Sequence, residues 1–145
     1  MLEIRKVLEE DKEIIIEWRN DPRVYKYALN PNPVSVENHE KWFGKVLSSN
    51  TCFFYMGIYD GKKCGTVRYD LLDNNHEAEV SISLAPDFWG KGLAFLLMNL
   101  GEAKLKLDSQ VKVIHATVLN ENTASMSLFV KSDFHPYLTK LKKEI

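Results

Sequence analysis

Six consecutive residues, Trp89 to Ala94, place two glycines and a lysine between a run that alternates like a strand and a leucine-rich run. Glycine has no Cβ and tolerates positive φ. Gly90 and Gly92 therefore allow consecutive backbone N–H groups to point at one anion at the start of a helix. This pattern favours a site for a phosphate-bearing ligand. A glycine turn that serves geometry alone remains the alternative.

The same stretch excludes two common phosphate ligands. A Walker loop ends in Gly-Lys-Ser/Thr, and a dinucleotide fingerprint needs three spaced glycines with an acidic residue further along the chain. Neither pattern is complete between Trp89 and Ala94. Nucleoside triphosphates and NAD are therefore poor candidates.

The strand before this loop, Glu77 to Leu84, has one polar and one apolar face because its side chains alternate with a period of two. Glu79 lies on the polar face, where a carboxylate could act as a general base, and Ser81 could help to hold a water molecule. A solvated sheet face is the alternative interpretation. If the strand lines the ligand site, its polar face carries the chemistry.

A third group of residues could bind an anionic substrate, since arginine can grip phosphate oxygens bidentately and tryptophan can stack on a flat ring. Taken one at a time, these arginines fit surface ion pairs, and His39 and Trp42 fit a helical packing face. The candidates for acceptor binding are Arg19, Asn20, Arg23, His39, Trp42 and Arg68.

The N-terminal half is predicted to form a strand, two helices and a hairpin. Leu2 to Val7 alternates like a strand, and Asp11 is a candidate N-cap for a helix that ends near Asn20, before Pro22. Ser35 can cap a second helix, from Val36 to about Leu47, whose apolar row includes His39 and Trp42. Two strands follow, Thr51 to Ile58 and Lys63 to Leu71.

In the C-terminal half, a helix, a strand and a last helix follow the glycine loop. The first helix is expected to pack on the sheet through a stripe, and Val111 to Leu119 is expected to form a strand. The last helix starts after its N-cap, Asn122, and is expected to turn Met126, Phe129 and Val130 inward. The stripe consists of Leu93, Leu96, Leu97, Leu100, Ala103 and Leu107. The element order β-α-α-β-β-β-α-β-α predicts a mixed α/β fold.

Length and charge fit one compact domain with no nucleic-acid or membrane partner. The chain has 145 residues, 45% of them hydrophobic, and 19 basic side chains against 20 acidic ones give a net charge of -1. No apolar run reaches the length of a membrane span, and the N-terminus lacks a signal peptide's apolar stretch. We expect a cytoplasmic protein. The oligomeric state stays open, a homodimer included.

The two cysteines are predicted to remain free thiols. The Asp60-Gly61 turn predicts a hairpin register that pairs Gly57 with Cys64 and Cys52 with Tyr69, so the cysteines do not face each other. Too few ligands cluster near them for a metal site, and none is expected.

Two motifs resemble those of the GNAT acetyltransferase superfamily. Trp89, Gly92 and Ala94 match positions one, four and six of its acyl-CoA loop, Gln/Arg-x-x-Gly-x-Gly/Ala, although Trp89 departs from the usual first residue. The run from Asn122 to Phe134 resembles Asn-x-x-Ser-x-x-Leu-Tyr-Glu-Lys-x-Gly-Phe. The motifs occur in the family's order and the element order also matches, so the resemblance covers nearly the whole chain.

The resemblance implies a single GNAT domain over residues 1–145, with a mostly antiparallel sheet flanked by about four helices. The sheet would splay open after the Glu77 to Leu84 strand, and acetyl-CoA would lie in the gap. Asn122 would hold the pantetheine arm, and the Trp89 to Ala94 amides the pyrophosphate. The residues implied against acetyl-CoA are Val80, Ile82, Leu84, Trp89, Gly90, Lys91, Gly92, Leu93, Ala94, Asn122, Ser125 and Phe129.

Two departures from the family pattern affect the catalytic site. Phe129 stands where the family often has the tyrosine that protonates the departing thiolate, and phenylalanine has no proton to give. The residues after Phe134 are too few for the family's two final strands, and no spacing argument assigns a role to the hydroxyl of Tyr137.

Within the superfamily, the chain looks like two branches, which acetylate nucleotide-linked amino sugars and the N-terminal amines of ribosomal proteins. The segments that carry this likeness are Trp18 to Pro22, Ser35 to Phe43, and Ala78 to Ser83. We predict acetyl transfer to a primary amine and favour the amino sugar, because only that acceptor offers phosphates. A non-catalytic acyl-CoA-binding module is the alternative that Phe129 favours.

Overall fold

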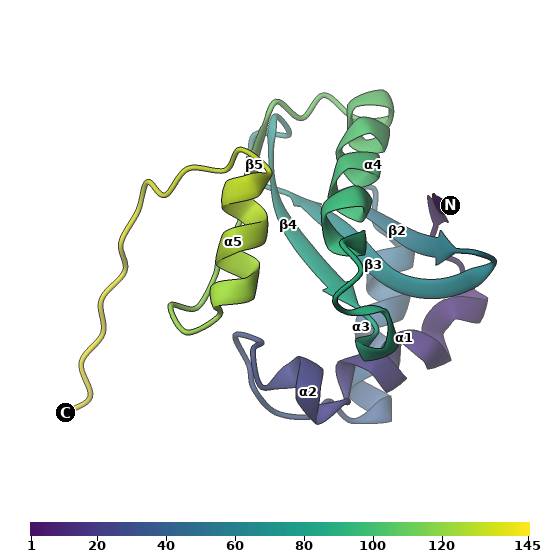
Figure 1. The fold of residues 1–145 in the computed structure, drawn as a ribbon, viewed down its shortest axis with the longest axis horizontal. Helices are drawn as coiled ribbons and strands as arrows, with labels where there is room; N and C mark the ends of the chain where they lie inside the picture. The colour runs from purple at the N-terminus through teal and green to yellow at the C-terminus, as the bar shows by residue number, and fades with distance from the viewer.

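A computed structural model describes residues 1–145 and shows a five-stranded sheet with helices on both faces (Figure 1). The strands are ordered β1-β2-β3-β4-β5, and all neighbours are antiparallel except the parallel pair β4 and β5. The strands are β1 (Leu2–Lys6), β2 (Cys52–Tyr59), β3 (Lys62–Leu71), β4 (Glu77–Leu84) and β5 (Val113–His115). The helices are α1 (Lys12–Arg19), α2 (Pro22–Tyr25), α3 (Val36–Ser48), α4 (Leu93–Asp108) and α5 (Thr123–Lys131), with short 3-10 turns at Glu9–Asp11 and Pro86–Phe88. The predicted mixed α/β fold is confirmed.

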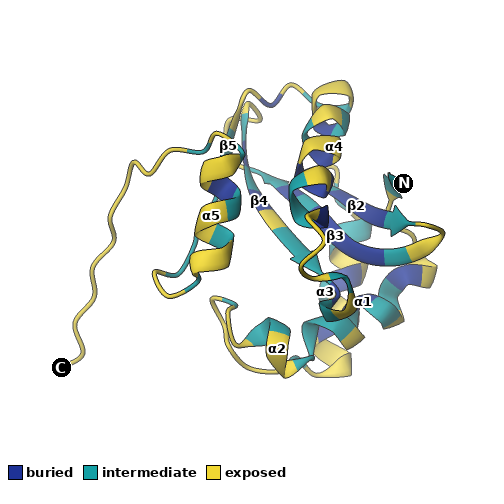
Figure 2. Cartoon of the chain, in the orientation of Figure 1, coloured by how far each residue is buried: buried dark blue, intermediate teal, exposed yellow.

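Two apolar cores hold the helices on the sheet. Alternate residues of β2 enter different cores, as the strand period requires: Phe54 and Met56 pack with α1 and α3, and Tyr55 packs with α4 and α5. The predicted packing face of α3 is confirmed at His39, which is buried together with Phe43. Helices α1 and α3 thus pack against β2 on one face of the sheet. On the same face of β4, Glu79 is half-buried and Ser81 is exposed, and Figure 2 shows most of this strand in the colour of intermediate burial.

The buried face of α4 differs from the predicted stripe. Leu93 and Leu97 are buried as expected, but Leu96, Leu100, Ala103 and Leu107 are exposed. The helix instead turns Met98, Gly101 and Leu105 to the sheet. Gly101 fixes this rotation, because a Cβ there would lie 2.8 Å from Val67 and 2.9 Å from the Tyr69 hydroxyl. The close approach of helix and sheet at this glycine could not be inferred from leucine spacing.

The hairpin of β2 and β3 corrects the predicted register. The structure shifts both predicted pairs by one residue, so Gly57 lies opposite Gly65 in place of Cys64, and Cys52 lies opposite Asp70 in place of Tyr69. A β-bulge beside Gly57 causes the shift, since one extra residue on β3 moves every later pair. Both cysteines are free thiols, and only Cys64 is fully buried.

Three further predictions need correction. Met126 and Val130 of α5 are exposed, and only Phe129 of the predicted inward set is buried. Strand β5 covers three residues rather than the predicted Val111 to Leu119, because its pairing with β4 ends at His115. Asp11 precedes α1, but its side chain makes no capping hydrogen bond.

The carboxylate of Asp11 instead joins three segments of the chain. It is fully buried, and it accepts hydrogen bonds from Arg5 at 2.8 and 3.0 Å and from the Leu8 N–H at 2.8 Å. The Lys63 ammonium lies 2.8 Å away.

No helix in the structure combines the length and apolar sequence that crossing a membrane requires.

Candidate active site

The glycine loop presents unpaired backbone donors at the start of α4. Gly90 and Gly92 have φ values of 78° and 72°, the left-handed conformation that their sequence predicted. The N–H groups of Gly90, Lys91 and Gly92 donate no hydrogen bond within the protein. They adjoin the N-terminus of a 16-residue helix, whose dipole favours negative charge. The loop can therefore bind a phosphate group through its backbone.

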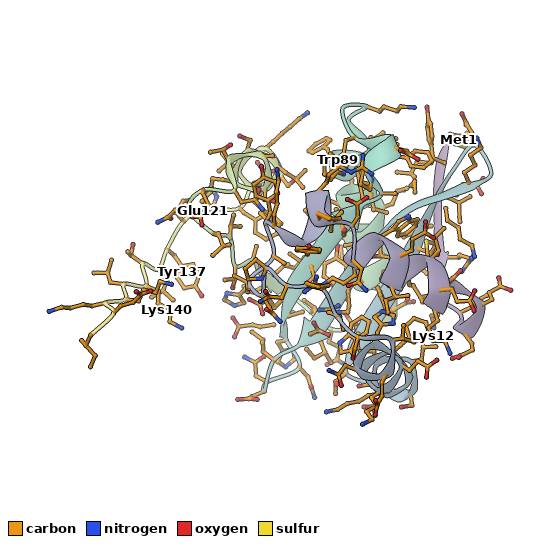
Figure 3. All side chains as sticks on the ribbon, turned by 90° about the horizontal axis from the view of Figure 1, so that it is seen from below. Met1, Lys12, Trp89, Glu121, Tyr137 and Lys140 are labelled. Atoms are coloured by element: carbon orange, nitrogen blue, oxygen red, sulfur yellow. The ribbon has the colours of Figure 1, made fainter.

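Trp89 ties this loop to the end of β4. Its indole N–H donates a 3.0 Å hydrogen bond to the carbonyl of Leu84, and its side chain remains partly exposed beside the loop (Figure 3). The ammonium of Lys91 lies 5.7 Å from the ring of Phe88 in the same link. These contacts fix the position of the loop relative to the strand.

Beyond Glu79, strand β4 has a paired strand on only one side. It pairs with β3 from Ala78 to Leu84, but with β5 only from Glu77 to Glu79. The backbone groups of a strand point alternately to its two sides, so those of residues 80–84 that face away from β3 have no strand partner. Val80 is buried, and Ile82 and Leu84 pack against the core beneath α4, so their backbone rather than their side chains faces the opening. The Leu84 carbonyl there accepts the hydrogen bond from Trp89.

Helix α5 faces this open edge with a polar N-terminus and an apolar body. Asn122 accepts a hydrogen bond from the Ser125 N–H at 3.1 Å, as its predicted capping role requires, and its amide N–H groups make no hydrogen bond. Phe129 is buried and packs edge-on against Phe134, with ring centroids 5.1 Å apart. The roles of Asn122, Ser125 and Phe129 toward a ligand stay predictions.

The polar face of β4 gathers several functional groups at the point where the sheet opens. Glu79 is half-buried, and its carboxylate accepts a hydrogen bond from the Thr117 hydroxyl. Arg68 donates to Ser81 at 3.3 Å and to Asp70 at 3.0 Å. Glu79, Ser81 and Arg68 therefore lie on one surface, as the sequence predicted for the first two.

Trp42 extends this surface from α3. The Arg68 guanidinium carbon lies 5.1 Å from the centroid of the Trp42 ring, within the range of a cation–π contact. Beside them is a hollow of about 250 Å³, lined in part by Trp42, Cys52 and Asp70. Burial and the nearby Asp70 carboxylate raise the pKa of the Cys52 thiol to about 12, so this thiol is not a nucleophile.

The remaining candidate acceptor residues make contacts within the protein. Arg19 donates to the carbonyls of Asn30 and Asn32 at 3.0 and 3.1 Å, and Arg23 pairs with Asp21 at 2.7 Å. Asn20 exchanges two hydrogen bonds with the backbone of Val34, at 2.8 and 2.7 Å. Arg19 and Asn20 thus hold the loop over residues 30–34. Of the set, Trp42 lies beside both Arg68 and His39, and its ring centroid is 5.4 Å from that of His39.

His39 lies in the core between α1 and α3. It is 4% exposed, its Nε2 has no hydrogen-bond partner, and it packs on Phe43 with ring centroids 5.9 Å apart. Burial, and secondarily the charges of Lys12 and Arg19, lower the pKa of His39. Its part in acceptor binding stays a prediction.

Sequence reasoning missed a chain of hydrogen bonds next to Glu79. The hydroxyl of Tyr137 lies 2.9 Å from Nδ1 of His115, and Nε2 of His115 lies 2.7 Å from the Glu77 carboxylate. Alternation offered a signal for one member, because His115 and Thr117 share a face of the predicted strand. The hydrogen bond of His115 lowers the pKa of Glu77, and Asn74 adds to this effect.

Comparison with known proteins adds to this geometry. The chain is 27% identical, over 90% of its length, to an uncharacterized protein of Methanocaldococcus jannaschii, and the match spans 27% of that relative. The spermidine N-acetyltransferase from Vibrio cholerae, solved with CoA and spermine, has a TM-score of 0.77 and 22% identity over 90% of this chain and 78% of its own. An aminoglycoside acetyltransferase solved with coenzyme A has a TM-score of 0.80 and 18% identity, and the match covers 93% of this chain and 84% of that chain.

At these identities the two solved structures establish a shared fold. The sequence model described as the acetyltransferase (GNAT) domain matches residues 1–135, which is most of the chain. That range contains the glycine loop, the open edge of β4 and the Asn122 cap. This protein therefore belongs to the GNAT acetyltransferase domain family.

Proposed function

We propose that this protein is an acetyl-CoA-dependent N-acetyltransferase that acts on a primary amine. The observation that carries the proposal is the unpaired amide cluster of Gly90 to Gly92 beside the open edge of β4. These amides would hold the pyrophosphate of acetyl-CoA, and the free backbone groups after Glu79 would hold its pantetheine arm. The thioester supplies an activated acetyl group, which passes to nitrogen as the thiol leaves.

Glu79 would act as the general base. An alkyl amine has a pKa near 10 and is mostly protonated at neutral pH, so it must lose a proton before its nitrogen can attack. The Glu79 carboxylate lies where β4 and β5 separate, and Thr117 fixes its orientation. Ser81, two residues along the same face, would hold a water molecule that relays the proton.

For the acceptor, we propose a nucleotide-linked amino sugar. Arg68 donates hydrogen bonds to Asp70 through Nε and to Ser81 through Nη2, and its Nη1 makes no hydrogen bond. That group could bind a phosphate oxygen, while the indole of Trp42 beside it could cover a sugar or a base. The fold neighbour that acts on aminoglycosides, which carry amino groups on sugars, supports an acceptor of this size.

A polyamine is the second candidate acceptor. Three carboxylates, Asp70, Glu77 and Glu79, lie along neighbouring positions of β3 and β4 and would attract a cation. The spermidine N-acetyltransferase among the fold neighbours is consistent with this alternative. N-terminal acetylation of proteins and a non-catalytic acyl-CoA-binding role are the other functions to be tested.

The deciding experiment is a thiol-release assay with acetyl-CoA. The panel contains nucleotide-linked amino sugars, spermidine and peptides with the N-termini of ribosomal proteins. We expect turnover of the sugars, with a KM that rises in Arg68→Gln while the affinity for acetyl-CoA is unchanged. Turnover of spermidine alone, or of the peptides alone, would show that the nucleotide-linked amino sugar is the wrong acceptor. Binding of acetyl-CoA by calorimetry without any thiol release would favour the non-catalytic module.

A further inference from the structure

A continuous hydrogen-bonded chain runs from the C-terminal segment into the polar face of β4. Tyr137 contacts His115 at 2.9 Å, and His115 contacts Glu77 at 2.7 Å. His115 is the last residue of β5 that pairs with β4, and its partner in the register is Glu79. His115, the middle member of these hydrogen bonds, therefore lies where the sheet opens.

Tyr137 is also the single polar anchor of its segment. Residues 135–145 run away from the body of the protein, and none of them makes another hydrogen bond (Figures 1 and 3). The phenol ring tilts over His115, with centroids 5.6 Å apart and 54° between the ring planes. Tyr137 is 75% exposed, so the side chain stays accessible to solvent beside His115.

The donors and acceptors of this chain can be assigned. An ionised Glu77 only accepts hydrogen bonds, so Nε2 of His115 must carry a proton. In a neutral imidazole Nδ1 is then an acceptor, and the Tyr137 hydroxyl must donate to it. The phenol oxygen keeps its lone pairs free. After the uptake of one proton, Nδ1–H donates to that oxygen instead, and the phenolic hydrogen becomes free to be donated.

We propose that Tyr137 is a catalytic residue that moves a proton from the attacking nitrogen to the departing sulfur. The inference rests on the proposed acetyl transfer. His115 holds the proton between the two steps, and Glu77 stabilises the imidazolium and orients its ring. His115 and Glu77 are thus positioning residues.

The protons balance over the cycle. A substrate ammonium loses one proton to Glu79, which returns it to water. As the N–C bond forms, the nitrogen loses a second proton to the oxygen of Tyr137, whose own proton passes to Nδ1 of His115. As the C–S bond breaks, Tyr137 protonates the sulfur and regains a proton from His115. The products are the amide, the free thiol and one proton, and the relay returns to its starting state.

The arrangement can be tested without a ligand by ¹⁵N NMR of the histidine rings. We expect His115 to be the Nε2–H tautomer, with an Nδ1 resonance shifted by the hydrogen bond from Tyr137. Tyr137→Phe should move that resonance. Tyr27→Phe, the same change at an exposed tyrosine remote from His115 in the sequence, should not. An Nδ1–H tautomer, or an Nδ1 resonance that Tyr137→Phe leaves in place, would overturn the relay.

Steady-state kinetics test the role of the Tyr137–His115 relay in turnover. In the thiol-release assay Tyr137→Phe and His115→Asn should each lower kcat by about 10²–10⁴-fold, with the KM for acetyl-CoA unchanged. His135→Asn, at an exposed histidine of the same segment, should retain the wild-type kcat. A wild-type kcat in Tyr137→Phe would exclude the proton relay but leave the proposed acetyl transfer in place. A wild-type protein that releases no thiol from the whole panel would contradict the proposed function, and the relay with it.

Discussion

The hydroxyl of Thr117 donates a hydrogen bond to the carboxylate of Glu79 across the point where β4 and β5 separate. Thr117 lies two residues beyond the last paired residue of β5, so this contact bridges the mouth of the opening. It leaves the second carboxylate oxygen of Glu79 free of protein partners. The Glu79 carboxylate is thereby held in one orientation, with one oxygen left to accept a further hydrogen bond.

Replacement of this base should reduce turnover without loss of donor binding. We expect Glu79→Gln to lower kcat by about 10²–10⁴-fold, because the amide cannot accept the substrate proton. The affinity for acetyl-CoA, measured by calorimetry, should stay within error of the wild type. Glu3→Gln, the same change on the exposed side of β1, is the control. A wild-type rate in Glu79→Gln would exclude Glu79 as the general base and would favour the interpretation of a solvated sheet face.

The loop glycine should be essential for acetyl-CoA binding. Gly92→Asp adds a Cβ and a negative charge where the pyrophosphate would meet the free amides, so calorimetry should detect no binding. Gly61 offers a matched control, because it has φ 82° and open space around it in the β2–β3 turn. Gly61→Asp carries the same backbone strain and should bind normally. Unchanged affinity in a folded Gly92→Asp protein would exclude the loop as the phosphate site.

The buried carboxylate of Asp11 should stabilise the fold. Asp11→Asn removes the buried counter-charge that Arg5 and Lys63 share, and we expect a loss of about 3 kcal/mol in the free energy of unfolding. Asp60→Asn removes an exposed ion pair with the N-terminus and should cost less than about 1 kcal/mol. Urea denaturation at pH 7 measures both. Equal losses would contradict the structural role of Asp11.

The contribution of Asp11 should also disappear in acid. Burial alone would raise the pKa of Asp11, but hydrogen bonds from Arg5, Leu8 and Lys63 outweigh burial and hold the pKa well below its ordinary value. The unfolded chain therefore takes up the proton first, and the stabilisation is complete only above the unfolded pKa of about 4. The difference between wild type and Asp11→Asn should shrink as the pH falls from about 5 toward 2.

His39 should make the fold sensitive to mild acid. Because burial lowers its pKa in the folded state, the unfolded chain binds more protons as the pH falls through its ordinary value of about 6.5. Wild-type stability should fall relative to His39→Leu between pH 7.5 and 5, as measured by urea denaturation. The exposed His135→Leu serves as the control and should show no such change. A pH-independent difference between wild type and His39→Leu would contradict a neutral, buried His39.

The sequence determined most of the local structure and the ligand loop. Period-two alternation located β4 from Glu77 to Leu84, and Ser35 and Asn122 marked the starts of two helices. The left-handed conformations at Gly90 and Gly92 also followed from residue type. These features depend on neighbours in the chain, so sequence patterns can predict them.

Only the tertiary structure decided which faces and partners meet. The rotation of α4 depends on the contact of Gly101 with Val67 and Tyr69, and leucine spacing does not contain that contact. The one-residue shift of β3 depends on a bulge that alternation does not reveal. The chain from Tyr137 through His115 to Glu77 joins residues 22 and 38 positions apart, so it forms only when β5 and the C-terminal segment reach β4. Contacts over such distances arise from packing, whereas sequence patterns report the local periodicity of the chain.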